Sequence, residues 1–283
     1  MDFKIFCINF ANVIRQITLK RLLFFLLAGM ILASCEFKLK SYDDDDDNAR
    51  IEVKRYDRLE SRYLTTGDFS ALQQMNIDYP METRTLIEKM TRIGSVDDPS
   101  ISTKFLNFYQ DSVLQTLIAD ASAEFASMDD VNEEFNSAFK YLRKHIAHFP
   151  KPMIYAQIGA LDQSVVVGDQ TIGFSIDKYL GVNYPLYAKY YTYAQRQQMT
   201  REYIVPDCLN FYLLSLYPMK NFEQRTQRER DLHVAKVMWV TNKALDKRFW
   251  KTPFVKMIDN YMKCHDDVTI DELLKGNDYS MFK

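Results

Sequence analysis

The chain has 283 residues, of which 47% are hydrophobic, 26% charged and 14% aromatic. This composition is typical of a globular protein and excludes disordered, collagenous and coiled-coil chains. A mean hydropathy of −0.30 excludes a polytopic membrane protein, and a net charge of −2 argues against a nucleic-acid partner, which calls for a basic excess. Four cysteines are too few for a disulfide scaffold.

Residues 1–34 have the pattern of a lipoprotein signal peptide. Lys20 and Arg21 precede an apolar run over 22–32, which ends in Leu-Ala-Ser-Cys at Cys35. The run is too short to cross a bilayer, which takes about 20 apolar residues. We therefore expect cleavage between Ser34 and Cys35 and acylation of Cys35. The lipid bilayer becomes a partner, and the expected location is the cell envelope, at the outer membrane, with the side left open.

Residues 35–49 follow the lipidated cysteine and are predicted to be an acidic tether. Asp43–Asp47 are five consecutive aspartates, and such a run repels itself and stays solvated. A calcium site is the alternative, but five consecutive aspartates cannot all face one ion without a turn. Acidic residues after the lipidated cysteine also resemble surface-export signals of Bacteroidetes lipoproteins, so outward display stays open.

Residues 50–283 are expected to form a single globular α+β domain, mostly helical with a small sheet that contains a β-hairpin. Ile51 and Val53, with charged residues beside them, predict a short first strand. Apolar residues at helical spacing predict helices over 56–75, 81–93, 105–125 and 131–149. Asp129 or Asp130 is the expected N-cap of the last of these.

The pattern changes after Pro150 and Pro152. Strands are predicted over 153–158, 164–167 and 171–176, and a turn containing Gly168 joins the last two into a hairpin. The rest of the chain is again helical in pattern, with helices expected over 196–217, 228–244, 253–263 and 269–274.

Common catalytic motifs are absent from the sequence. The four histidines, none followed by glutamate, are His145, His148, His233 and His265, so no zinc-binding His-Glu-x-x-His helix is present. There is no Gly-x-Ser-x-Gly elbow and no phosphate-binding glycine-rich loop. We therefore expect no cofactor and no metal. Cys208 and Cys264 either pair in an oxidising compartment or remain two buried free thiols.

Tyrosines are dense between the hairpin and the next helix. Tyrosine combines rigid apolar area with a polar group, which suits recognition surfaces. Packing of an ordinary loop is the alternative. The cluster contains Tyr184, Tyr187, Tyr190, Tyr191 and Tyr193.

Three segments after the lipobox carry a resemblance to a known family. They are Arg50-Ile51-Glu52-Val53-Lys54-Arg55-Tyr56-Asp57, Ser175-Ile176-Asp177-Lys178-Tyr179-Leu180-Gly181 and Arg201-Glu202-Tyr203-Ile204-Val205-Pro206-Asp207. In this order they resemble the gliding-motility-associated lipoproteins of the GldB type from Bacteroidetes. The resemblance covers residues 50 to 283 and implies association with gliding or related secretion machinery.

The family is similar, more remotely, to zincin-like metallopeptidases, in which a strand pair precedes the zinc helix. The resemblance places Pro206, Asp207 and Asn210 where that motif has its first histidine, its glutamate and its second histidine. Proline has no ligand atom and asparagine is a poor zinc ligand. The implied arrangement is therefore a degenerate zincin-like one without catalytic residues.

The leading hypothesis is a non-catalytic envelope lipoprotein that binds or assembles an envelope protein partner, with candidate binding residues Asp177, Tyr179, Tyr184, Tyr187 and Tyr190. One alternative is an envelope hydrolase, peptidase-like or glycan-acting, that uses Asp177 or Asp207. The other is a surface nutrient-binding lipoprotein, favoured by the tyrosine cluster and the acidic tether.

Overall fold

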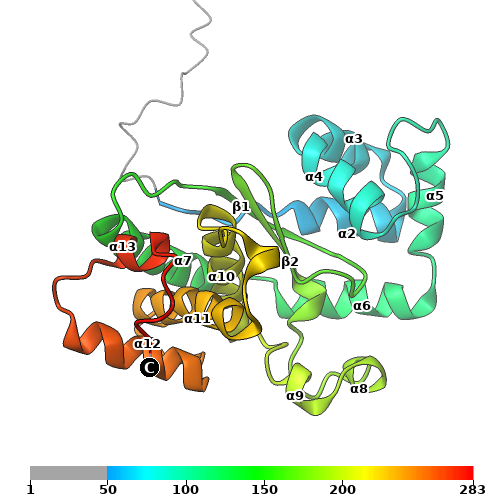
Figure 1. Cartoon of the computed structure of the whole chain (residues 1–283). Helices are drawn as coiled ribbons and strands as arrows, with labels where there is room; N and C mark the ends of the chain where they lie inside the picture. Colours follow the sequence, from blue (N-terminus) through cyan, green and yellow to red (C-terminus); the bar gives the residue numbers. More distant parts are fainter. Residues whose placement is uncertain (1–49, 283) are drawn as a thin grey trace, which may run out of the picture. The chain divides into compact units, whose positions relative to one another are not determined.

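A three-stranded sheet lies between two groups of helices in this computed structural model, which describes residues 50–282 (Figure 1). The strands are β1 (Met153–Gln157), β2 (Val165–Val167) and β3 (Thr171–Ser175), in the order β1-β3-β2. β3 is antiparallel to β2 and parallel to β1. The predicted hairpin is thus confirmed. The expectations for the signal peptide, Ser34, Cys35 and the tether fall outside the described residues.

Helices precede the sheet. They are α2 (Tyr56–Thr66), α3 (Phe69–Asp78), α4 (Pro80–Arg84), the π-helical turn η2 (Thr85–Met90), α5 (Ile101–Phe108), α6 (Ser112–Glu124) and α7 (Asp129–His145). Helices also follow it. These are η3 (Ile176–Lys178), α8 (Tyr187–Tyr190), α9 (Tyr193–Arg196), η4 (Arg201–Tyr203), α10 (Ile204–Leu216), η5 (Phe222–Gln224), α11 (Gln227–Ala244), α12 (Pro253–Cys264) and α13 (Ile270–Lys275). The mostly helical α+β class is confirmed, whereas the zincin-like arrangement stays a prediction.

The predicted first strand at Ile51 and Val53 is wrong, because side chains of α7 hold this segment. Asn136 accepts a hydrogen bond from the Ile51 N–H at 2.7 Å and donates to its carbonyl, and Asn132 accepts from the Val53 N–H at 2.8 Å. Only Lys54 forms a bridge to the sheet, parallel to Tyr155.

Several predicted helices are divided or shortened. The 56–75 helix breaks at Gly67, whose φ of +70° ends α2. The 105–125 helix is two helices, because the Asp111 carboxylate caps a new one at Ser112. The N-cap of α7 is Met128, so Asp129 and Asp130 lie in its first turn instead. The 196–217 helix starts only at Ile204, after the bridge of Thr200 to Leu180.

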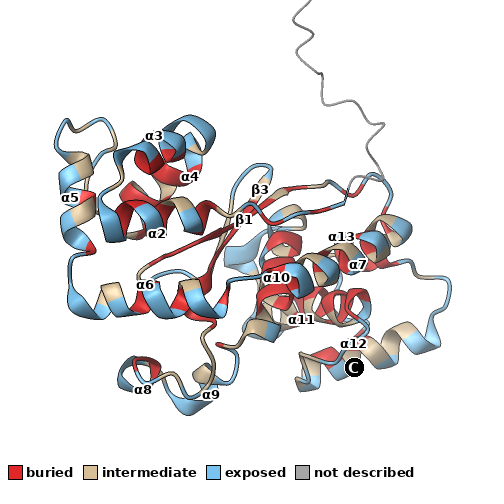
Figure 2. Cartoon of the chain, turned by 180° about the vertical axis from the view of Figure 1, so that it is seen from behind, coloured by how far each residue is buried: buried red, intermediate tan, exposed pale blue. Residues whose placement is uncertain are grey.

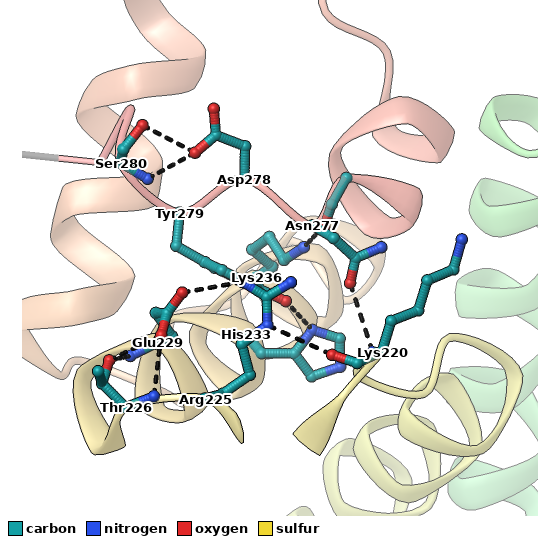
Figure 3. A network of polar contacts seen from close by, with 11 residues as sticks. Lys220, Arg225, Thr226, Glu229, His233, Lys236, Asn277, Asp278, Tyr279 and Ser280 are labelled. Carbon is teal, nitrogen blue, oxygen red and sulfur yellow. Dashed lines mark hydrogen bonds and ion pairs between the residues drawn. The ribbon is translucent and has the colours of Figure 1, made fainter. Parts of the chain in front are cut away.

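The C-terminal segment packs onto α11 through a partly buried polar network (Figure 3). The Lys236 ammonium donates to the Gly276 carbonyl at 2.6 Å and lies 4.9 Å from the centre of the Tyr279 ring. The Tyr279 hydroxyl is 3.0 Å from His233 Nδ1. Burial lowers the pKa of Lys236 to about 8 and is the main cause that lowers the pKa of His233 to about 4. The tail is therefore part of the folded core.

One hydrophobic core extends from α2 to α13, and it includes β1 and β3, which are buried on both faces (Figure 2). Within the sheet, Gly173 on β3 faces the Tyr155 ring on β1. A Cβ atom at position 173 would be 2.3 Å from Tyr155 Cζ. The tyrosine ring therefore fills the space that a side chain on β3 would need.

We expect Gly173→Ala to destabilise the chain by about 2–3 kcal/mol, because overpacking forces side chains off their rotamers. Thermal unfolding checks this. Gly94→Ala is the matched control, since its Cβ meets Ile101 at an ordinary 3.4 Å. Adding Tyr155→Val to Gly173→Ala should recover part of the loss, and strict additivity of the two substitutions would contradict the explanation.

Candidate functional site

The carboxyl ends of β1 and β3 meet at a buried carboxylate. Asp177 follows β3 and is fully buried. Its two carboxylate oxygens accept hydrogen bonds from the N–H groups of Gly159 at 2.7 Å and Leu161 at 2.6 Å, in the loop that follows β1. Ala160 and Leu161 both have positive φ, 50° and 64°, which is unfavourable for residues with a side chain. The carboxylate holds this strained loop in place.

Three further side chains, from the segment 178–191, bond to this loop or to the backbone around Asp177. The Lys178 ammonium donates to the Leu161 carbonyl at 3.2 Å and to the Tyr191 hydroxyl at 2.9 Å. Tyr191 also donates to the Leu161 carbonyl, at 3.0 Å. The buried Tyr187 hydroxyl donates to the Asp177 carbonyl and accepts from the Leu180 N–H at 3.0 Å. Figures 1 and 2 show the resulting position of α8 and α9 beside α6.

Tyr179 and Asp207 form a second polar pair. The Tyr179 hydroxyl is buried and donates to Asp207 Oδ2 at 2.9 Å. Burial raises the pKa of Asp207 to about 7, and the hydrogen bond from Tyr179 partly opposes this shift. The pair joins the residue that follows η3 to the first turn of α10. Two of the segments that carried the family resemblance are therefore bonded to each other.

Pro206 and Asn210 lie in the interior of the fold, on α10. Both are buried, and the Asn210 Oδ1 atom accepts a hydrogen bond from the Thr241 hydroxyl of α11 at 2.7 Å. Between residues 50 and 282, no group of three or more His, Cys, Asp or Glu side chains is placed to hold a metal ion. Cys208 and Cys264 are free thiols; Cys208 is buried, whereas Cys264 is exposed, contrary to the expectation of two buried thiols.

A shallow cavity of about 310 Å³ lies between α6 and the segment that contains α8. Tyr184 lines it and donates a hydrogen bond to the Asp120 carboxylate at 2.9 Å. Lys189 brings a positive charge to the same cavity. We call it the α6 groove; it is lined by Ser112, Val113, Thr116, Asp120, Tyr184, Pro185, Leu186 and Lys189.

The candidate binding residues therefore divide into three groups. Asp177, Tyr179 and Tyr187 are buried and engaged in internal hydrogen bonds. Tyr184 lines the α6 groove. Tyr190 is exposed over 69% of its surface, although it is not among the residues that line the groove.

The sequence analysis missed Glu60, a buried acid next to the same loop. Its Oε2 atom accepts from the Ile158 N–H at 2.7 Å, while Oε1 has no hydrogen-bond partner among the described residues. Burial raises its pKa well above the usual range. A signal was present, because Glu60 lies on the apolar stripe that Tyr56, Tyr63 and Leu64 form on α2.

Three arginines were also missed, although Arg55 and Arg201 lie in segments that carried the resemblance. They surround the turn between α6 and α7. Arg55 donates to the Phe125 carbonyl at 2.7 Å and Arg58 to the Ala126 carbonyl at 2.8 Å. Arg201 donates to the Glu124 and Ser127 carbonyls and forms a bidentate pair with Asp130. This pair lowers the pKa of Asp130.

A family model described as gliding motility protein GldB matches residues 40–248. The chain belongs to the GldB family of gliding motility lipoproteins. The match includes the sheet, the loop at Asp177, the α6 groove and α10, whereas α12 and α13 lie beyond it. No curated protein and no solved structure matches this GldB-family chain. Every helix within residues 50–282 is too short or too polar to cross a bilayer.

We expect Asp207→Asn to make stability less dependent on pH. The folded-state pKa of about 7 lies above the unfolded value of about 4, so the wild-type chain loses stability as pH rises from about 4 to about 7. Asparagine avoids that loss and still accepts from Tyr179. Relative to wild type, the variant should gain about 4 kcal/mol between pH 4 and pH 8, because the two pKa values differ by about 3 and each pKa unit is worth about 1.4 kcal/mol.

Thermal unfolding at the two pH values measures this gain. Asp169→Asn, at an exposed aspartate in the hairpin turn, is the control. A stability difference between Asp207→Asn and wild type that does not change with pH would show that Asp207 is not the titrating group.

Proposed function

We propose that this chain is a membrane-anchored lipoprotein of the cell envelope that works as a non-catalytic binding or assembly module. The observation that carries the proposal is membership in the GldB family over residues 40–248. A lipidated Cys35 supplies the anchor, and the folded residues from 50 onward supply the binding surface. The membrane is the outer membrane in this proposal.

The internal hydrogen bonds of Asp177 and Asn210 favour a non-catalytic role. Asp177 is fully buried, and each of its carboxylate oxygens already accepts a backbone hydrogen bond. Asn210 is bonded to Thr241. A general acid or base must reach the proton it transfers, and a buried carboxylate enclosed by its own backbone has no such access. In this proposal, the role of both polar side chains is to stabilise the fold.

The α6 groove is the surface that suits a partner best. It combines apolar side chains such as Val113 and Leu186 with a carboxylate at Asp120 and an ammonium at Lys189. Apolar contact with a few fixed polar groups is the usual composition of a recognition site. We propose that an envelope protein inserts an apolar side chain here and pairs its charges with Asp120 and Lys189.

Lipidation is tested by replacing Cys35. In cells fed an alkyne-tagged fatty acid, the wild-type protein should carry the label, and Cys35→Ala should lose all of it and keep residues 1–34 attached. The acylated residue must be the first of the mature chain, so both effects follow from one change. Cys264→Ala, at an exposed cysteine, is the control and should keep the label. Full labelling of Cys35→Ala would contradict the anchor.

The partner surface is tested by crosslinking in intact cells. A photoreactive phenylalanine at Val113, which is 44% exposed in the α6 groove, should give a protein adduct on irradiation. Lys189→Glu should reduce that adduct about tenfold, since reversing a charge replaces an attraction with a repulsion. The same probe at Ile77, which is 76% exposed, is the control and should give no adduct. An adduct with a glycan, or equal adducts at both positions, would contradict the proposal.

A further inference from the structure

Positive charge gathers at the end of α7 without acidic neighbours in the sequence. Residues 135–161 contain no Asp or Glu, although the chain as a whole has an acidic excess. We call the cluster in this stretch the α7 basic end; it consists of Lys140, Arg143, Lys144, His148 and Lys151. Lys140, Lys144 and His148 are exposed. Within residues 50–282, no carboxylate lies within ion-pair distance of Lys140, Arg143 or Lys144.

Compensation of the helix dipole explains only part of this cluster. Basic residues in the last turn of a helix are favourable because of the partial negative charge there. Arg143 and Lys144 are in that turn. Lys140 lies before the last turn, and His148 and Lys151 lie after the helix. The cluster therefore extends beyond what the dipole favours.

The chain enters the described part next to the same helix. Asn132 and Asn136 of α7 bind Val53 and Ile51 respectively, so the entering chain runs antiparallel to α7. Lys140 and Lys144 continue the stripe of Asn132 and Asn136 at four-residue spacing, toward the end from which the chain arrives.

The pairing of Lys54 with the sheet also locates the point where the chain enters the described part. Lys54 pairs with Tyr155 in parallel, so Arg50 and Lys151, each four residues earlier, lie toward the same end. Figures 1 and 2 show the first described residues beside the loop that joins α7 to β1.

We propose that the α7 basic end binds the anionic phospholipid headgroups of the membrane in which Cys35 is anchored. The inference rests on the proposed lipidation. The 15 residues 35–49 span at most about 50 Å, which keeps the folded part near the bilayer. The aspartates Asp43–Asp47 are repelled by anionic headgroups. The attraction to the membrane surface therefore comes from basic residues of the folded part.

Tethering makes weak charge contacts effective. Each basic side chain near an anionic surface strengthens the association about fivefold. An attached ligand also acts at a high local concentration, so a few such contacts are enough to orient the folded part. The bound orientation places the α7 basic end against the lipid.

The test uses the lipidated protein, purified from membranes and placed in nanodiscs. Lysine acetylation rates, measured by mass spectrometry, compare discs of phosphatidylglycerol with discs of phosphatidylcholine. We expect Lys140 and Lys144 to react about fivefold more slowly in the anionic discs, and 0.5 M NaCl to remove the difference. Lys89 and Lys256, exposed on η2 and α12, are internal references whose rates should not change.

A charge-reversed pair provides the matched variant. In anionic discs, hydrogen exchange of residues 146–152 should be slowed in the wild type and in Lys89→Glu/Lys256→Glu. The slowing should be lost in Lys140→Glu/Lys144→Glu, which changes the net charge by the same amount.

Each other outcome overturns the inference. Equal rates in the two kinds of disc would show that charge is not involved, and slowing in both would show mere proximity to the bilayer. Slowing in native membranes alone would assign the cluster to a different partner. A chain without lipid on Cys35 would contradict the proposed anchor itself, and mass spectrometry of the same sample shows this before any disc is made.

Discussion

The hydrogen bonds of the Asp177 carboxylate determine much of the fold around the sheet. A parallel pair of strands leaves both carboxyl ends at one edge, and the chain must turn away from each. Asp177 leaves β3 and accepts from the loop that leaves β1, so a single side chain fixes both exits. Its neighbour Lys178 then binds the same loop from the other direction, at the Leu161 carbonyl. A buried carboxylate of this kind is stable only with such donors.

The segments that carry the family resemblance owe their residue types to this framework. Tyr179 reaches Asp207 across to α10, while Arg55 and Arg201 both bind the turn between α6 and α7. Residues far apart in the sequence thus share partners. Such shared contacts constrain sequence strongly even where no reaction takes place, because losing one partner leaves a buried polar group unsatisfied. They are therefore weak evidence for catalysis and good evidence for a common fold.

Local patterns in the sequence predicted the helices and strands better than the contacts between them. Two short strand segments around a turn containing Gly168 predicted the β2–β3 hairpin, and helical spacing predicted α11 and α12 closely. The strand at Ile51 failed because asparagine side chains replaced a neighbouring strand, which periodicity does not report. The tyrosine cluster was recognised, but its hydroxyl partners were not. Whether a tyrosine such as Tyr187 is a tether or a contact residue depends on a fold that brings Asp177 to it.

The turn between α6 and α7 couples the two proposed surfaces. α6 forms one wall of the α6 groove, and α7 carries the α7 basic end. A turn of a few residues normally allows two helices to move, but here arginines from two places bind its carbonyls: Arg55 and Arg58 at the start of α2, and Arg201 on η4. The groove therefore keeps a fixed position relative to the basic end. If the basic end rests on lipid, a partner in the groove is held at a set height above the membrane, which is the property that an assembly module needs.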